Sequence, residues 1–154
     1  MVRNDDGALE AVIGWNAVKV ARIIGNRITA ELAAHDIGLV QFGVLSCLAG
    51  GAEMTSAYIA RAVFVRPQSM SEVLDGMERR GLVQRVGVRS KGRRNPVRIT
   101  DDGERALAAS QEIATGTNDL SDLGLSAAES ARLNALLLTV IRAADGQPPG
   151  DPLR

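Results

Sequence analysis

The sequence has few of the residues on which enzyme and metal sites commonly depend. Its 154 residues include one cysteine and one histidine. A single cysteine, Cys47, excludes a disulfide within the chain and cannot build a cysteine-based metal site. One histidine, His35, supplies at most one base of that kind, and neither a P-loop nor a dinucleotide fingerprint is present. We therefore expect a protein that is not an enzyme and that needs no cofactor or metal.

Long apolar runs are missing as well. The N-terminus reads MVRNDDGALE, with acids where a signal peptide would need apolar residues. We therefore expect a soluble, cytoplasmic protein. Apolar residues still make up 45% of the chain, which is sufficient for one domain with a core of its own.

The chain also lacks net charge, because 18 basic residues balance 18 acidic ones. The charges are nevertheless unevenly distributed. The segment 61–98 holds ten basic and three acidic residues, a net charge of +7, so the rest of the chain carries −7. A molecule with one basic sector is typical of nucleic-acid-binding proteins.

Helices are predicted on the N-terminal side of this sector. Apolar residues recur at spacings of three and four from Leu9 to Ala34 without a proline, so we expect one long helix there. A second helix is expected over 39–50, closed by two glycines. Its inward side chains are predicted to be Phe42, Leu45 and Leu48.

A helix-turn-helix is predicted at the start of the basic sector. Thr55 suits the N-cap of a short third helix that runs to about residue 63 and buries Ile59 and Ala62. Pro67 suits the first turn of a fourth helix that runs to residue 80 and is stopped by a glycine. The apolar stripe of this fourth helix is Met70, Val73, Leu74 and Met77. A short helix, a tight connection and an amphipathic helix in this order indicate a helix-turn-helix.

A β-hairpin is predicted directly after it. Roughly alternating patterns indicate strands over 82–88 and 96–100. The basic stretch between them contains the turn formers Gly92 and Asn95. Residues expected to point inward are Leu82, Val86, Val97 and Ile99, and those expected to point outward are Gln84, Arg85 and Arg98.

Two more helices complete the prediction. Thr100 suits the N-cap of a fifth helix that continues to around residue 118. The sequence SAAE over 126–129 is a capping box for a sixth helix. The first and sixth helices are too apolar for one small domain to cover. We therefore expect them to bury each other across a homodimer interface.

The predicted fold is mainly α, an α+β winged helix-turn-helix of six helices and a two-stranded β-hairpin wing. It is expected to dimerise through its N- and C-terminal helices. The expected parts are an N-terminal dimerisation helix (1–36), a DNA-binding lobe (37–100), the C-terminal helices of the dimerisation region (101–145) and a disordered tail (146–154).

Four short motifs follow one another at specific spacings: QFGVL at 41–45, IA at 59–60, MERRGLV at 77–83 and ITDDG at 99–103. Their order and spacing resemble the MarR family of bacterial winged-helix transcription regulators, over about residues 37–107. The resemblance implies a triangular homodimer with terminal helices as its base and two lobes that grip double-stranded DNA. It also implies repression of neighbouring genes, and release of DNA when a small, often aromatic, ligand binds between base and lobe.

Two groups of residues are predicted to contact DNA. The first turn of the fourth helix offers small polar groups to a major groove, and the arginines of the hairpin tip suit a narrow minor groove. The predicted contacts are Arg66, Gln68, Ser69 and Ser71 on the helix, and Arg89, Lys91, Arg93 and Arg94 on the wing. Arg93 and Arg94 are expected in the groove, and Arg89 and Lys91 on phosphates. Family wings commonly carry Asp-x-Arg here, and Lys91 in place of the aspartate raises the positive charge.

Two alternatives remain open. Glu72 and Asp75 on the polar side of the fourth helix would repel phosphates, which favours a winged helix used for protein–protein contact without specific DNA binding. Cys47 lies away from the apolar stripe of its helix, which favours an oxidant-sensing regulator. Ligand-binding residues are left unassigned, since core or interface packing is the default for Trp15 and Tyr58.

Overall fold

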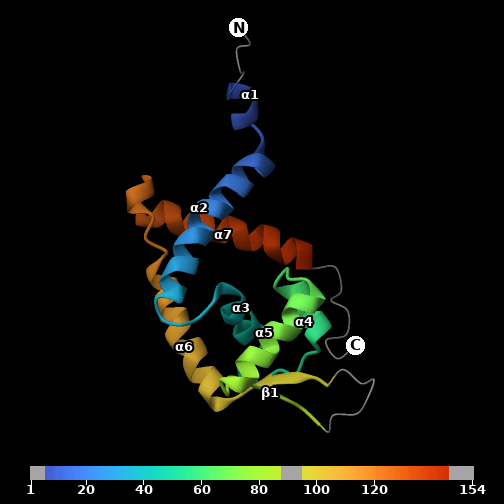
Figure 1. The fold of residues 1–154 in the computed structure, drawn as a ribbon. Coiled ribbons are helices and arrows are strands. Elements are labelled where there is room, and N and C mark those ends of the chain that lie inside the picture. The colour runs from blue at the N-terminus through green and yellow to red at the C-terminus, as the bar shows by residue number, and fades with distance from the viewer. Residues whose placement is uncertain (1–5, 88–94, 146–154) are drawn as a thin grey trace.

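The computed structural model describes residues 6–87 and 95–145. A helical lobe with a small β-hairpin lies at one end, and two long helices extend from it (Figure 1). The elements are α1 (Asp6–Glu10), α2 (Ile13–Ala33), α3 (Leu39–Leu48), η1 (Ala49–Gly51), α4 (Ser56–Ala62), α5 (Pro67–Arg79), β1 (Val83–Arg85), β2 (Val97–Ile99), α6 (Asp101–Gly116), η2 (Ser121–Leu123) and α7 (Ala127–Asp145).

The N-terminal segment is not the single helix that its periodicity predicts. The helix is interrupted before Ile13, because Val12 has extended backbone angles, φ −89° and ψ 100°. The side chain of Asn16 donates to the carbonyl oxygen of Glu10 at 2.8 Å, a bond that competes with helical backbone bonds. The described chain therefore contains seven α-helices, where six were predicted.

Side chains from α3, α4, α5 and β2 form the core of the lobe. The fully buried residues include Leu45, Leu48, Ile59, Met70, Leu74, Met77 and Val97. The predicted stripe of α5 is confirmed, with Val73 partly buried against this core. Phe42 is also only partly buried. The prediction that Ala62 is buried is wrong: α4 ends at this exposed residue, and Ala60 beside Ile59 is buried instead.

The predicted helix starts are confirmed by side-chain hydrogen bonds. The hydroxyls of Thr55 and Thr100 each accept from the amide three residues ahead, at 3.3 and 3.1 Å. Ser126 and Glu129 form the capping box of α7, with the Ser126 amide donating to the Glu129 carboxylate at 2.8 Å. Helix α6 ends at Gly116, slightly earlier than predicted.

Helix α6 passes very close to the hairpin at Gly103. A Cβ atom at this position would lie 2.6 Å from Cγ1 of Ile99 and even closer to the carbonyl oxygen of Leu82. Contacts this short do not occur between real side-chain and backbone atoms, so a larger residue would force the two elements apart. Gly103 therefore allows α6 to pack on the sheet.

Two non-glycine residues of the described chain have a left-handed backbone. Asp36 and Phe64 both have φ of 58°. This conformation costs an L-residue about 1–2 kcal/mol, and it is tolerated better by aspartate than by a bulky aromatic residue. Asp36 lies between α2 and α3, and Phe64 lies in the turn between α4 and α5.

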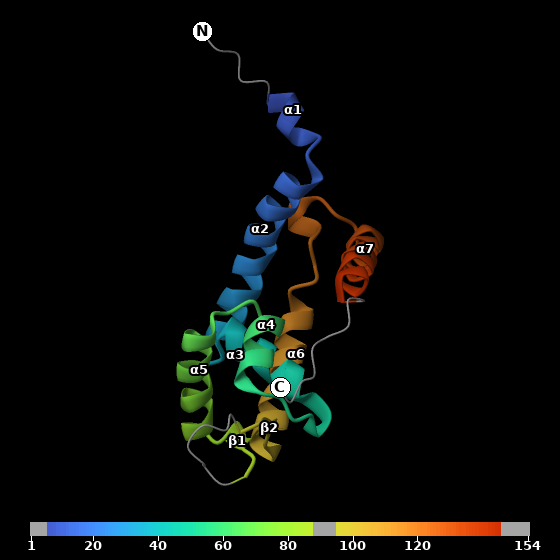
Figure 2. The same ribbon diagram turned by 90° about the vertical axis from the view of Figure 1, so that its right-hand side faces the viewer.

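The long terminal helices leave large apolar side chains in solvent. No residue of α7 from 127 to 144 is buried, and α7 packs extensively against no other described element. Figure 2 shows α7 standing apart from the lobe and from α2. The exposed apolar side chains of these helices include Ile13, Trp15, Val18, Ile23, Leu136, Leu137, Val140 and Ile141. Within the described ranges, no helix is both long and apolar enough to cross a membrane.

Candidate nucleic-acid interface

The first turn of α5 forms an exposed polar end of the lobe. Pro67 occupies the first helical position, where its missing N–H group costs no hydrogen bond, and Arg66 is the N-cap residue. Met70 is fully buried and anchors this turn to the core. The predicted contact residues Arg66, Gln68, Ser69 and Ser71 are all exposed. The structure thus brings these four together beside the unpaired amides of a helix N-terminus, an arrangement that suits an anionic ligand.

Two of the three acidic residues of α5 form ion pairs with an arginine of the hairpin. Nη2 of Arg85 on β1 contacts Oδ1 of Asp75 at 2.5 Å, and Nε contacts Oε2 of Glu78 at 3.5 Å. The prediction that Arg85 points outward is therefore wrong, because in β1 it shares a face with the buried Val83 and is drawn towards α5. Arg85 pairs with Asp75, one of the two acids that weighed against DNA binding, and it fastens α5 to the hairpin. Within the described residues, Glu72 has no ion-pair partner.

The C-terminal end of α5 is also tied to the loop that leaves α2. Nη1 of Arg80 donates to Oε1 of Gln41 at 3.1 Å, and Nη2 donates to the carbonyl oxygen of Asp36 at 2.9 Å. The amide of Gly38 donates to the same Gln41 oxygen at 3.0 Å. The C-terminal half of helix α5 is therefore fixed twice, by Arg80 to the α2–α3 loop and α3 and by Arg85 to the hairpin.

The wing is an antiparallel pair in which Gln84 lies opposite Arg98. Of the residues predicted to point outward, Arg98 is exposed and Gln84 partly so, while Val97 and Ile99 are buried as expected. Leu82, directly before β1, and Val83, the first residue of β1, are both buried. The predicted wing contacts Arg89, Lys91, Arg93 and Arg94 lie outside the described residues, as does the tail 146–154.

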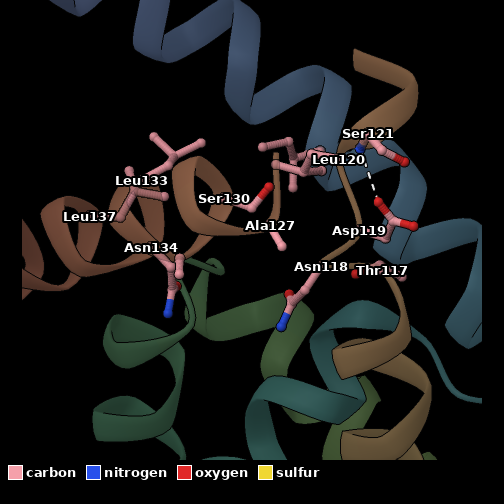
Figure 3. Close-up of a pocket in the computed structure, with 12 residues that line it drawn as sticks. Thr117, Asn118, Asp119, Leu120, Ser121, Ala127, Ser130, Leu133, Asn134 and Leu137 are labelled. Atoms are coloured by element: carbon pink, nitrogen blue, oxygen red, sulfur yellow. Dashed lines mark hydrogen bonds between the residues drawn. The ribbon is translucent and has the colours of Figure 1, made fainter. Parts of the chain in front are cut away.

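A cavity of about 660 Å³ opens between α2, the segment 117–121 that follows α6, and α7. Leu120, Leu133 and Leu137 supply apolar walls, and the side chains of Asn118 and Asn134 point towards the lobe (Figure 3). The hydroxyl of Ser130 is shielded from solvent and has no hydrogen-bond partner within the described chain. A mainly apolar cavity with a few polar groups is typical of a small-molecule site.

An ion pair closes one side of this region. Arg27 of α2 donates to both carboxylate oxygens of Asp122, at 3.1 and 2.6 Å, and to the carbonyl oxygen of Asp119 at 2.8 Å. The hydrogen bond from Arg27 holds the pKa of Asp122 below its ordinary value, and hydrogen bonds from Ser121 do the same for the pKa of Asp119. These contacts fix the loop before α7 against α2.

Asp122→Asn should lower the melting temperature slightly at neutral pH and leave it unchanged in acid. A carboxylate whose folded pKa is lowered stabilises fully above its unfolded value, here 3.8, and loses that contribution as pH falls through the folded value. Thermal melts followed by circular dichroism should show a constant difference from wild type well above pH 3.8, which shrinks as the pH falls below that value. A difference that does not change with pH would contradict this assignment.

Comparison with known proteins identifies the group to which the chain belongs. Residues 35–94 match the sequence model of the MarR family. The chain is 32% identical over 110 residues to the HTH-type transcriptional repressor Rv2887 of Mycobacterium tuberculosis, covering 71% of this chain and 78% of that repressor. The chain belongs to the MarR family. The resemblance stated from the four sequence motifs is thereby confirmed.

Solved MarR-family structures have the same fold. The MarR-family regulator SPO1453 of Silicibacter pomeroyi matches with a TM-score of 0.70 at 22% identity, covering 89% of this chain and 98% of that one. Apo MarR of Escherichia coli matches with a TM-score of 0.72 at 22% identity, covering 84% and 96%. Rv2887 in complex with salicylic acid matches with a TM-score of 0.70 at 25% identity, covering 84% and 96%. A further Rv2887 structure contains DNA.

Redox and metal chemistry find little support in this member of the MarR family. Cys47 is half-buried, and burial raises the pKa of its thiol, which lowers the reactive thiolate fraction. His35 lies within hydrogen-bonding distance of the carbonyl oxygen of Glu31, 3.0 Å from its Nδ1. No group of His, Cys, Asp and Glu among the described residues is arranged to hold a metal ion. The structure therefore weighs against Cys47 as an oxidant sensor.

Two functional residues escaped sequence analysis. Arg80 was counted only as a member of the basic sector and Arg85 was predicted to point outward; their partners on α5, α3 and the α2–α3 loop become visible only in the fold. The spacing of Asp75 from Arg85 carries no local signal, because the two residues belong to different elements.

Proposed function

We propose that the protein is a homodimeric transcriptional repressor that binds a pseudo-palindromic operator and releases it when a small ligand binds. The observation that carries the proposal is the exposed first turn of α5, on a helix that the buried Met70 anchors to the core and that Arg80 and Arg85 fix at its C-terminal half. Helices fixed in this way present side chains to a major groove in a defined orientation. The cytoplasm, where operator DNA is found in bacteria, is the proposed location, and no catalytic activity is part of the proposal.

The proposed division of labour follows the exposed surfaces. Residues 37–100 form the DNA-binding lobe, and residues 1–36 and 101–145 form the dimer base. The apolar side chains that α2 and α7 leave in solvent support a second copy of the chain as their partner, since monomeric proteins rarely expose extended apolar faces. Two-fold symmetry then places two lobes on half-sites about one turn of DNA apart.

DNA binding is tested by three substitutions measured against duplexes of different sequence. Gln68→Ala and Ser69→Ala should alter sequence preference, each by roughly 5- to 150-fold at one base pair, because base contacts carry specificity. Arg93→Ala should lower the affinity for every duplex by about the same factor, whatever its sequence, because phosphate and shape contacts do not read base edges. Fluorescence anisotropy with a protein-selected duplex and scrambled duplexes measures both quantities.

Arg132→Ala, on α7 away from the lobe, is the matched control for loss of a cation and should bind like wild type. If Gln68→Ala, Ser69→Ala and Arg93→Ala all bound DNA as wild type does, the protein–protein module would become the better explanation. Of the two acids that favour that module, Asp75 is paired with Arg85, whereas Glu72 has no ion-pair partner within the described residues.

The cavity beside α7 is the proposed ligand site. Rv2887 has been solved with salicylic acid and with p-aminosalicylic acid, and the apolar walls of the cavity suit a small aromatic ring. Its buried Ser130 hydroxyl and its two asparagine amides offer hydrogen bonds to a polar substituent. The cavity is lined by residues of the proposed base alone, from α2, the segment after α6 and α7, so an occupant can shift these elements against one another.

Ser130→Ala should lower the affinity for salicylate by about 2- to 12-fold, the effect of one net hydrogen bond. Isothermal titration calorimetry measures this change directly. Ser46→Ala is the control, because the Ser46 hydroxyl already donates to the carbonyl oxygen of Phe42 at 2.9 Å on a different element. Equal salicylate affinity in both variants and in wild type would place the ligand elsewhere.

A further inference from the structure

Phe64 has an unusual combination of exposure and backbone conformation. It is 96% exposed, and it has the left-handed φ of 58° that favours glycine. The turn around it is nevertheless well anchored. The Phe64 amide donates to the carbonyl oxygen of Arg61 at 3.3 Å, and the Val65 amide donates to that of Ala60 at 2.8 Å. Nothing within this chain favours a phenylalanine here: the ring is exposed, and the left-handed backbone disfavours a bulky side chain.

The ring is separate from the apolar faces of the terminal helices. Between residues 40 and 122, Phe64 is the one large apolar side chain that is exposed in the described structure. All other side chains of this kind lie on or beside α1, α2 and α7, or at Leu39 and Leu123. A second copy of the chain seated on the terminal helices would therefore leave Phe64 exposed.

The surroundings of Phe64 are basic and belong to the proposed DNA-binding end of the lobe. Arg61 and Arg66, three residues before it and two after, are both exposed. The Arg61 guanidinium lies over the ring of Tyr58, 5.8 Å from its centroid. Arg66 is the N-cap residue of α5, directly before the exposed Gln68 and Ser69. Phe64 thus has a cation on either side of it in the sequence and lies just before α5, the helix proposed to enter the major groove. An aromatic ring in this position fits the edge of a DNA groove.

We propose that Phe64 reads a thymine of the operator by packing its ring against the C5-methyl group in the major groove. This inference rests on the proposed DNA-binding function and adds a specificity-determining residue to it. The methyl group distinguishes thymine in the major groove, and phenylalanine is one of the apolar side chains that contact it. Contact with DNA would cover a ring that otherwise remains in water.

The test replaces thymine by deoxyuridine, one position at a time, in a duplex that the full-chain protein selects from a random library. With wild-type protein, one thymine in each half-site should be sensitive, because losing one buried methyl lowers affinity about 3- to 5-fold. With Phe64→Gly, the same replacement should have no effect, whereas Phe64→Tyr should retain the thymine preference. Because glycine tolerates the left-handed φ, Phe64→Gly should not lower the melting temperature.

Asp36→Gly is the matched control. It removes the second non-glycine residue with φ of 58°, in the α2–α3 loop, and should keep the wild-type ratio of thymine to deoxyuridine affinity. If no duplex is selected from the library, the proposed function itself fails. If a duplex is selected but Phe64→Gly shows the wild-type ratio at every position, the assignment of Phe64 is overturned while DNA binding stands. Phe64→Asn, which also tolerates this backbone, repeats the measurement if Phe64→Gly unfolds.

Discussion

Val140→Asp should convert the protein into a monomer and lower its affinity for operator DNA by about 10²- to 10⁴-fold. That factor is the gain that linking two binding modules commonly produces, and it is lost when the link is broken. Val140 lies on α7 and is 69% exposed in the single chain. The substitution therefore places a charge on the surface of the isolated fold but inside the proposed interface.

The physical reason is the state of α7 in a single chain. The helix buries no side chain between residues 127 and 144 and leaves Leu136, Leu137, Val140 and Ile141 exposed. Burial of such side chains contributes about 1.5–3 kcal/mol each, whereas an unpaired carboxylate transferred into the same interface costs several kcal/mol. The free-energy cost of burying one aspartate should thus offset the favourable burial free energy of several apolar neighbours.

Sedimentation equilibrium measures the oligomeric state, and anisotropy with the selected duplex measures affinity. Ala109→Asp adds the same charge to an exposed position of α6 and should remain dimeric. A Val140→Asp variant that stayed dimeric would show that α7 does not form the interface. A monomer with unchanged operator affinity would show that the two lobes do not bind together.

Gly103→Ala should destabilise the fold by about 1–3 kcal/mol, the usual cost of forcing extra volume into a packed site. The added methyl would overlap the carbonyl oxygen of Leu82 and approach Cγ1 of Ile99 to 2.6 Å. Leu82 cannot move away freely, because its carbonyl oxygen accepts from the Thr100 amide at 3.1 Å. Relief therefore requires α6 to shift from the hairpin, which disturbs the position of the wing.

Urea unfolding followed by circular dichroism measures this loss. Gly116→Ala is the control within the same helix, because a Cβ at Gly116 meets nothing within 4 Å. That variant should be as stable as wild type or more stable by up to about 1 kcal/mol, since alanine is the better helix residue. Equal stability of Gly103→Ala and Gly116→Ala would mean that α6 and the hairpin are not packed as described.

Local signals allowed much of the lobe to be predicted from sequence. Pro67 begins α5, Thr100 caps α6 and Ser126 with Glu129 caps α7, and each acts within a few residues of the element it defines. The apolar stripe of α5 was equally readable, because helical periodicity records which face is buried. These features needed no knowledge of the tertiary fold.

The remaining features depend on contacts between distant elements or on local details that no periodic pattern records. Arg85 turns towards Asp75 because β1 lies beside α5. In α4, which ends at Ala62, the buried alanine is Ala60. At the break before Ile13, the apolar pattern is continuous while the side chain of Asn16 bonds to the carbonyl oxygen of Glu10. Alternation and periodicity do not encode these contacts. The location of the candidate interface was therefore predicted from the sequence, whereas the ion pairs within it were not.

The pairing of Arg85 also bears on how binding should respond to salt. DNA releases condensed counterions when a cation neutralises a phosphate, and each such contact adds about 0.9 to the slope of log affinity against log salt. A guanidinium already held by Asp75 and Glu78 displaces no counterion from the duplex. The measured slope should therefore correspond to fewer cations than the ten in segment 61–98. The affinity for DNA should fall less steeply with salt concentration than the arginine content suggests.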